Sequence, residues 1–170
     1  AKGQLWCWGQ QTYDEVVPGG AATEYAPTQV PDKADPTGSL TGITAVAVGS
    51  QFTCAVKPKV GVLCFGRNDV GQCGQDSKQF TVAKPTVAFA GDVATLGAGK
   101  HFACARTQDG KVACWGLGTE GQMGNGAVTP GTGSAAGLVT GLAGTSHVGV
   151  GASHACAVLA EGAVKCWGSA

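Results

Sequence analysis

Six of the eight cysteines fall into three pairs whose members are ten residues apart. Cysteine side chains can form disulfides or bind zinc. Structural zinc sites usually contain cysteines only about two to four residues apart, and this sequence has no such pair and no histidine that recurs in step with the cysteines. We therefore interpret the pairs as disulfides and predict neither a metal site nor a cofactor. The predicted bonds are Cys54–Cys64, Cys104–Cys114 and Cys156–Cys166.

Each cysteine pair brackets a predicted β-hairpin. In HFACARTQDGKVACWG (residues 101–116), Gly110 is the third residue of a three-residue loop, a position that favours a left-handed glycine. Pairing outward from this loop places Cys104 opposite Cys114. Opposed residues of a non-hydrogen-bonded antiparallel pair have Cα atoms about 4.5 Å apart, which is near the short limit for a disulfide. The third copy has the same register, whereas in the first copy Gly61 comes one residue later, which predicts a different loop with the same cysteine spacing.

Cys7 and Cys73 remain outside the three pairs. A Cys7–Cys73 bond would make the cysteine count even; the alternative is that Cys7 pairs with a strand outside this chain. A disulfide that closes so short a loop restricts the unfolded chain by roughly 3 kcal/mol. Because disulfides persist outside the reducing cytosol, the cysteines predict a secreted or cell-surface protein.

The hairpin belongs to an internal repeat. Full copies occupy residues 46–66, 96–116 and 148–168, and a truncated copy, GQLWCWG, occupies residues 3–9. Each full copy has a glycine five residues before its first cysteine, and an aromatic residue and a glycine follow its second. A period of about fifty residues made of short strands predicts a β-propeller or a similar array. We divide the chain into a partial repeat (1–9), a connector (10–42) and repeats at about 43–92, 93–144 and 145–170.

Composition agrees with an all-β fold and narrows the function. The chain has 170 residues, usually one domain, with 29 glycines and no apolar pattern of helical period. Its net charge is zero and only 13% of its residues are charged. This argues against a nucleic-acid or membrane-surface footprint, which needs a basic excess. No apolar run approaches the ~20 residues of a membrane span, so we expect no membrane insertion.

The repeat resembles that of the regulator of chromosome condensation (RCC1) family. The match is best in GASHACAVLAEGAVKCWG (151–168), and GRNDVGQCG (66–74) matches the tail of the family pattern, which ends in Gly-Gln-x-Gly. Phe52 and Phe102 depart from the pattern, since they replace a family histidine that His154 keeps. The resemblance implies four-stranded blades around a channel, commonly about seven. This chain would hold three to three and a half blades, as a segment of a larger propeller or as one of two chains that assemble one.

Aromatic residues are the main candidates for contacts. A tryptophan that recurs by column is more often inter-blade core than a sugar platform, and this describes Trp8, Trp115 and Trp167. Trp6 has no aromatic counterpart in its column, so we predict an exposed contact residue there. Tyr13 and Tyr25 lie in the connector, which we predict to be a long surface loop that either rims a binding surface or is simply solvated.

Polar residues are weaker candidates for a binding or catalytic site. Asp14, Glu15 and Glu24 share the connector with the two tyrosines and have the same two interpretations. We interpret His154 as a blade-core histidine bonded to backbone, as in the family, and His101 and His147 as surface or turn residues. No Ser/His/Asp set, carboxylate pair or phosphate loop is evident.

Together these features predict a non-enzymatic, extracellular propeller that serves as a structural or protein-interaction module. Its partners would be proteins, further blades or copies of itself, and not nucleic acid. The RCC1 resemblance implies an alternative, a guanine nucleotide exchange factor for a small GTPase. Two further alternatives are a lectin-like carbohydrate binder that uses Trp6 or the connector, and an enzyme inhibitor.

Overall fold

A computed structural model gives the fold and describes residues 3–20, 23–32, 38–128 and 132–169. The regular elements of this part of the chain are all β-strands. They are β1 (Trp6–Gln10), β2 (Thr23–Gln29), β3 (Ala45–Val48), β4 (Phe52–Lys57), β5 (Gly61–Arg67), β6 (Thr81–Phe89), β7 (Val93–Ala98), β8 (Phe102–Thr107), β9 (Val112–Leu117), β10 (Thr132–Leu138), β11 (Thr145–Val150), β12 (His154–Leu159) and β13 (Val164–Gly168).

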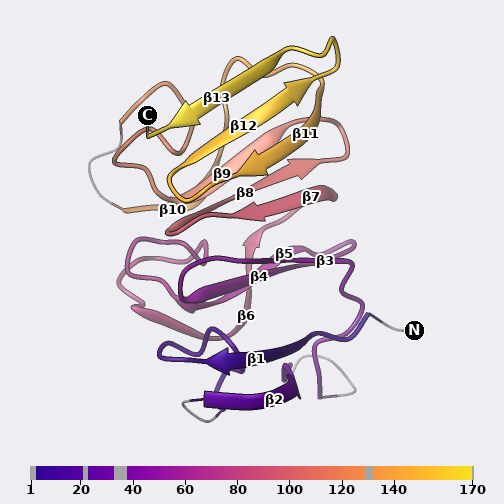
Figure 1. The fold of residues 1–170 in the computed structure, drawn as a ribbon, viewed down its shortest axis with the longest axis vertical. Helices are drawn as coiled ribbons and strands as arrows, with labels where there is room; N and C mark the ends of the chain where they lie inside the picture. The colour runs from indigo at the N-terminus through magenta and orange to yellow at the C-terminus, as the bar shows by residue number, and fades with distance from the viewer. Residues whose placement is uncertain (1–2, 21–22, 33–37, 129–131, 170) are drawn as a thin grey trace.

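The strands form four antiparallel sheets that follow one another along the long axis of Figure 1. Two sheets are complete four-stranded meanders, β3–β6 and β7–β10, while β1–β2 has two strands and β11–β13 has three. Among the first strands of the blades, β7 contacts both β3 and β11, so these strands lie on the inner side of the array. Sheets that repeat in this way around a common inner side are the blades of a β-propeller, as the sequence predicts.

The hairpins have the predicted register, with the two cysteines of each pair directly opposite each other. The Cα atoms of the paired cysteines are 4.1, 4.1 and 4.0 Å apart in chain order. Gly110 and Gly162 have φ values of 80° and 86°, which suit the third position of a three-residue loop. In the first hairpin Lys59, at φ 66°, and Gly61, at φ 119°, both have positive φ, so its loop differs as expected.

The core lies between the blades. Leu63 and Phe65 of the β3–β6 blade face the β1–β2 sheet, and they pack in one cluster with Leu5, Cys7 and Val30. The opposite face of the same blade carries Cys54 and Cys64 and packs against Ala103, Ala105 and Trp115 of the next blade. A third cluster joins the β7–β10 blade to β11–β13 through residues that include Cys104, Met123 and Val148.

The glycine that precedes each hairpin is required by a ring that packs on it. A Cβ atom at Gly99 would lie 2.4 Å from Cε1 of Phe102, and one at Gly49 would lie 1.9 Å from the same atom of Phe52. Side chains larger than hydrogen do not fit under these rings. The recurring glycine therefore reflects close packing between the end of the first strand and the start of the second.

The expectation that residues 10–42 form a surface loop is wrong for much of that segment. β2 lies within it and pairs with β1. Residues 11–20 fold back on themselves, since Gln11 Oε1 accepts a 2.7 Å hydrogen bond from the Val17 amide. The Thr53 hydroxyl donates to the Glu15 carbonyl oxygen at 2.6 Å, which ties the segment to β4. Buried apolar side chains inside the connector, Val16 and Val17 among them, explain why it packs on the blade.

Candidate protein-interaction face

Arg67 is the centre of an aromatic patch on the β3–β6 blade. Its guanidinium carbon lies 5.3 Å from the ring centroid of Tyr13 and 5.8 Å from that of Phe80. The two rings contact each other edge to face, with centroids 5.5 Å apart. Arg67 ends β5, Phe80 directly precedes β6 and Tyr13 comes from the connector, so the patch joins three segments. We call Tyr13, Arg67 and Phe80 the Arg67 patch.

Hydrogen bonds hold the guanidinium of Arg67 in place. It donates to both carboxylate oxygens of Asp69, at 2.8 and 2.5 Å, and to the side-chain oxygen of Gln51 at 2.8 Å. The hydrogen bond to Asp69 raises the pKa of Arg67 above its ordinary value. Burial favours the neutral acid of Asp69, but hydrogen bonds from Arg67 and Gln72 outweigh it and lower the pKa of that carboxyl. The patch thus presents a guanidinium that an ion pair with Asp69 holds in place. It also presents an apolar ring, since Phe80 is 51% exposed.

A second feature is the hollow beside β1, of about 610 Å³, whose walls include Trp6, Trp8, Val46 and Val48. We call it the β1 hollow. Trp6 is exposed, as predicted, and lies on the same face of β1 as Trp8.

The structure does not bring the predicted contact residues Trp6 and Tyr13 into one site, because Tyr13 belongs to the Arg67 patch and not to the wall of the β1 hollow. The side chain of Tyr25, the third predicted contact residue, lies outside the described residues, as does that of Glu24.

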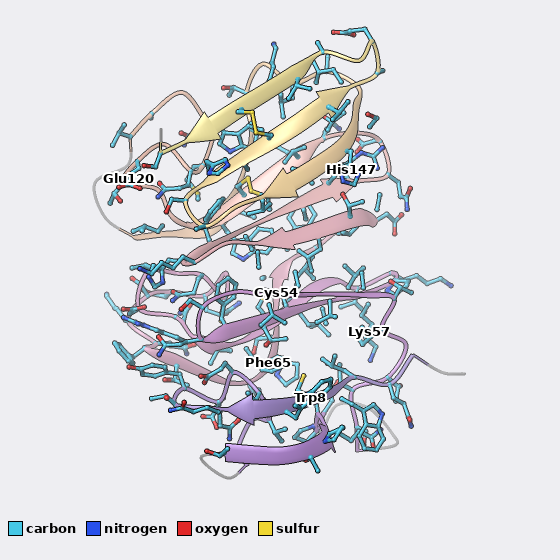
Figure 2. The ribbon with its side chains drawn as sticks, in the orientation of Figure 1. Trp8, Cys54, Lys57, Phe65, Glu120 and His147 are labelled. Carbon is cyan, nitrogen blue, oxygen red and sulfur yellow. A yellow bond between two sulfur atoms is a disulfide. The ribbon has the colours of Figure 1, made fainter. Side chains whose placement is uncertain are left out.

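The tryptophan column is only partly an inter-blade core. Trp115 and the equivalent Phe65 are fully buried, and Trp167 is half-buried. Trp8 contradicts the prediction, because 63% of its side chain is exposed. Within the described chain no blade precedes β1, and Figure 2 shows Trp8 at that end of the array. A residue of this column is buried only where an earlier blade covers it.

The three predicted cysteine pairs are disulfide-bonded in the structure. Of the two alternatives for the remaining cysteines, a Cys7–Cys73 bond is wrong, because both cysteines are free. Cys7 packs between β1–β2 and the second blade, whereas Cys73 packs on the far side of that blade. Burial raises the pKa of both thiols above the ordinary value. Cys73 takes the core position that Met123 has in the next blade, which explains its burial.

The interpretation of His154 as a core residue is also wrong. Its side chain is exposed, whereas Phe52 and Phe102 in the same column are buried, because no described blade covers the last sheet. His147 is exposed, as expected, but Nδ1 of His101 is buried and has no hydrogen-bond partner among the described residues. Burial and nearby Arg67 lower the pKa of His101.

The described residues contain no group of three or more His, Cys, Asp or Glu side chains placed to hold a metal ion. They also contain no helix that is long and apolar enough to cross a membrane.

Comparison with known proteins agrees with the geometry. The pattern of the regulator of chromosome condensation (RCC1) repeat matches residues 93–122 and 146–169. Human E3 ubiquitin-protein ligase HERC2 is 34% identical over 128 residues, which are 72% of this chain. The chain belongs to the RCC1 repeat family.

Solved RCC1-like propellers share this fold. Human WBSCR16 superposes with a TM-score of 0.80 over 96% of this chain at 22% identity. Yeast RCC1 (Prp20), in its crystal structure with Kap60 bound, gives a TM-score of 0.78 over 98% of this chain at 19% identity. The chain spans 42% and 40% of these two proteins and 2% of HERC2.

The tail of the RCC1 repeat links successive blades. In the Gly-Gln-x-Gly turn, the side-chain oxygen of Gln72 accepts from the Val70 amide at 3.0 Å, and its carbonyl oxygen accepts from Trp115 Nε1 at 3.1 Å. The next turn repeats this arrangement, since Trp167 Nε1 donates to the Gln122 carbonyl oxygen at 2.9 Å. The turn therefore supplies the hydrogen-bond acceptor for the tryptophan of the following RCC1 repeat.

Sequence reasoning missed Arg67 and Phe80 because neither is a residue that recurs between the copies of the repeat. Leu117 occupies the position of Arg67 in the next copy. The sequence feature that could have indicated this site is that Arg67 is charged, whereas the equivalent residue of the next copy is a leucine. The partner Tyr13 lies more than fifty residues earlier in the chain, so their contact could not be inferred from local spacing.

Proposed function

We propose that this RCC1 propeller segment is a non-enzymatic protein-interaction module that works outside the reducing cytosol. The observation that carries the proposal is the cross-strand disulfide in each of three successive hairpins. Reducing compartments keep such cysteines as free thiols, whereas secreted and cell-surface proteins retain the disulfides. Each bond fixes the centre of one blade, so the scaffold holds its loops in constant positions for a partner.

The Arg67 patch supports a protein as the partner. Tyr and Arg are enriched among the residues that dominate binding energy at protein interfaces. Arg67 is held by Asp69 and Gln51 before any partner arrives, so little side-chain entropy is lost on binding. Yeast RCC1, which shares the fold, was crystallised with the protein Kap60 bound. We therefore assign the contact with a protein partner to the Arg67 patch.

Thiol mapping tests the compartment. Protein in its native source is first denatured in the presence of an alkylating reagent, and is then reduced and treated with a second reagent of different mass. We expect the six hairpin cysteines to carry only the second label. First label on all six would show free thiols and contradict an oxidising location.

Photo-crosslinking tests the patch. A photoreactive phenylalanine analogue replaces Phe80 in one variant and Val87 in the control. Val87 is also an exposed apolar residue of the same blade, on β6. We expect at least about tenfold more crosslinked protein partner from position 80, because direct contacts there exclude water. Equal yields from the two positions would show that the Arg67 patch is not part of the interface with the partner.

A further inference from the structure

The β1–β2 sheet is the outer half of an incomplete blade. Cys7 on β1 pairs with Thr28 on β2, just as Cys64 on β5 pairs with Thr86 on β6. β1 therefore corresponds to the third strand of a blade. In the second blade, the other edge of that strand pairs with β4; in the described chain the same edge of β1 has no strand beside it.

The surface that the missing first two strands would cover is apolar and open. Val46 and Val48 on β3 are 50% and 68% exposed. Their counterparts on β11 are Val148 and Val150; Val148 is only 6% exposed, and both pack against the preceding blade. The β1 hollow lies at this place, between β1 and β3. The internal repeat thus identifies what covers such a surface: the first two strands of a blade.

Cys7 shows what the second of these strands must carry. Cys64, Cys114 and Cys166 occupy its column, and each is bonded to a cysteine directly opposite on the second strand of its blade. We propose that two antiparallel strands from a further RCC1 repeat of the same polypeptide fill the β1 hollow, and that a cysteine on the strand beside β1 forms a disulfide with Cys7. This proposal rests on the oxidising location proposed above.

The bond forms by ordinary thiol oxidation. The two thiols lose two protons and two electrons as their sulfur atoms join. A disulfide oxidant of the compartment, either oxidised glutathione or a protein disulfide, takes up the two electrons and protons and becomes two thiols.

A second copy of this chain is a poorer occupant. Six of its cysteines are already bonded and Cys73 is buried, so only its own Cys7 could react. Its strands β11 and β12 are already paired within their own sheet. A Cys7–Cys7 bond between copies would also leave Val46 and Val48 uncovered. The solved RCC1-like propellers are more than twice as long as this chain, which agrees with further repeats in one polypeptide.

Disulfide mapping of the protein from its native source tests the proposal. Trypsin leaves Cys7 alone on peptide 3–33 and Cys73 alone on peptide 68–78. We expect non-reduced digests to contain peptide 3–33 joined to a cysteine peptide from outside residues 1–170, in a protein that stays one polypeptide on a reducing gel. Peptide 68–78 should be alkylated only after denaturation.

Other results overturn the proposal. These are a free thiol at Cys7 while the six hairpin cysteines are bonded, a bond from Cys7 to Cys73 or to a second Cys7, and a partner peptide that reduction releases as a separate chain. Free thiols in the hairpins would instead refute the oxidising location itself. In the full polypeptide, Cys7→Ser should expose exactly one new thiol, whereas the control Cys73→Ser should expose none.

Discussion

The indole nitrogen of Trp115 donates a 3.1 Å hydrogen bond to the carbonyl oxygen of Gln72, 43 residues earlier in the chain. The bond joins one blade to the next, and it forms where the indole is fully buried. The ring also stacks on Phe89 of the preceding blade, with an angle of 5° between the planes. One side chain therefore fixes the position of two sheets that share no backbone hydrogen-bond ladder.

Trp115→Phe should lower the free energy of unfolding by about 1–3 kcal/mol, because a buried carbonyl loses its donor and a smaller ring leaves space. Trp167→Phe removes the equivalent bond at a half-buried position, where water can replace the donor, so its effect should be smaller. Urea unfolding followed by circular dichroism measures both. If the two variants lose the same unfolding free energy, burial does not determine how much the hydrogen bond stabilises the fold.

Gly99→Ala should destabilise the chain by about 1–3 kcal/mol, as overpacking does in a tight core. The new methyl group would meet Phe102 at 2.4 Å and the Gly151 carbonyl oxygen at 2.5 Å. Gly149→Ala is the matched control, since a Cβ atom there meets nothing within 4 Å. Thermal and urea unfolding should place the control within about 0.5 kcal/mol of the unaltered chain. A tolerated alanine at position 99 would contradict the packing explanation of the glycine column.

The repeat predicts features that depend on short sequence separation. Cys104 and Cys114 face each other across a three-residue loop, so the position of one glycine sets their register. The exposure of Trp8 and His154 could not be predicted in this way, because it depends on whether another blade covers the sheet. The Cys7–Cys73 alternative failed for a different reason: an even count says nothing about which side of a blade each cysteine faces.

The Cys156–Cys166 disulfide should be the first that dithiothreitol reduces in the folded 170-residue chain. All three bonds close loops of the same length, since their sequence separation is 10. Cys166 is exposed, whereas all four cysteines of the other two pairs are fully buried. Exchange needs access of the attacking thiolate to sulfur, so we expect at least about tenfold faster reduction of this bond. Timed alkylation and peptide mass measurement would give the order, and simultaneous reduction would argue that global unfolding controls all three.

Asp69→Asn should destabilise the chain at neutral pH and lose its effect in acid. The lowered pKa of Asp69 in the folded state means that its charged form stabilises the fold above the unfolded pKa of about 3.9. This contribution is lost as the pH falls through the folded pKa. The Asp69 and Arg67 side chains are 22% and 26% exposed, so we expect at most about 1 kcal/mol at pH 7.

Urea unfolding of the unaltered chain and of Asp69→Asn between pH 7 and pH 3 measures this difference. The gap in unfolding free energy should close below about pH 4, where the carboxyl of Asp69 begins to take up a proton in the unfolded chain. Arg67→Met is the matched control. Without the guanidinium, the Asp69→Asn substitution should change the unfolding free energy less at every pH. A gap that stays constant to pH 3, or one that persists fully in the Arg67→Met background, would mean that the ion pair does not hold the patch together. The position of Arg67 between Tyr13 and Phe80 would then depend on ring packing and on the hydrogen bond to Gln51.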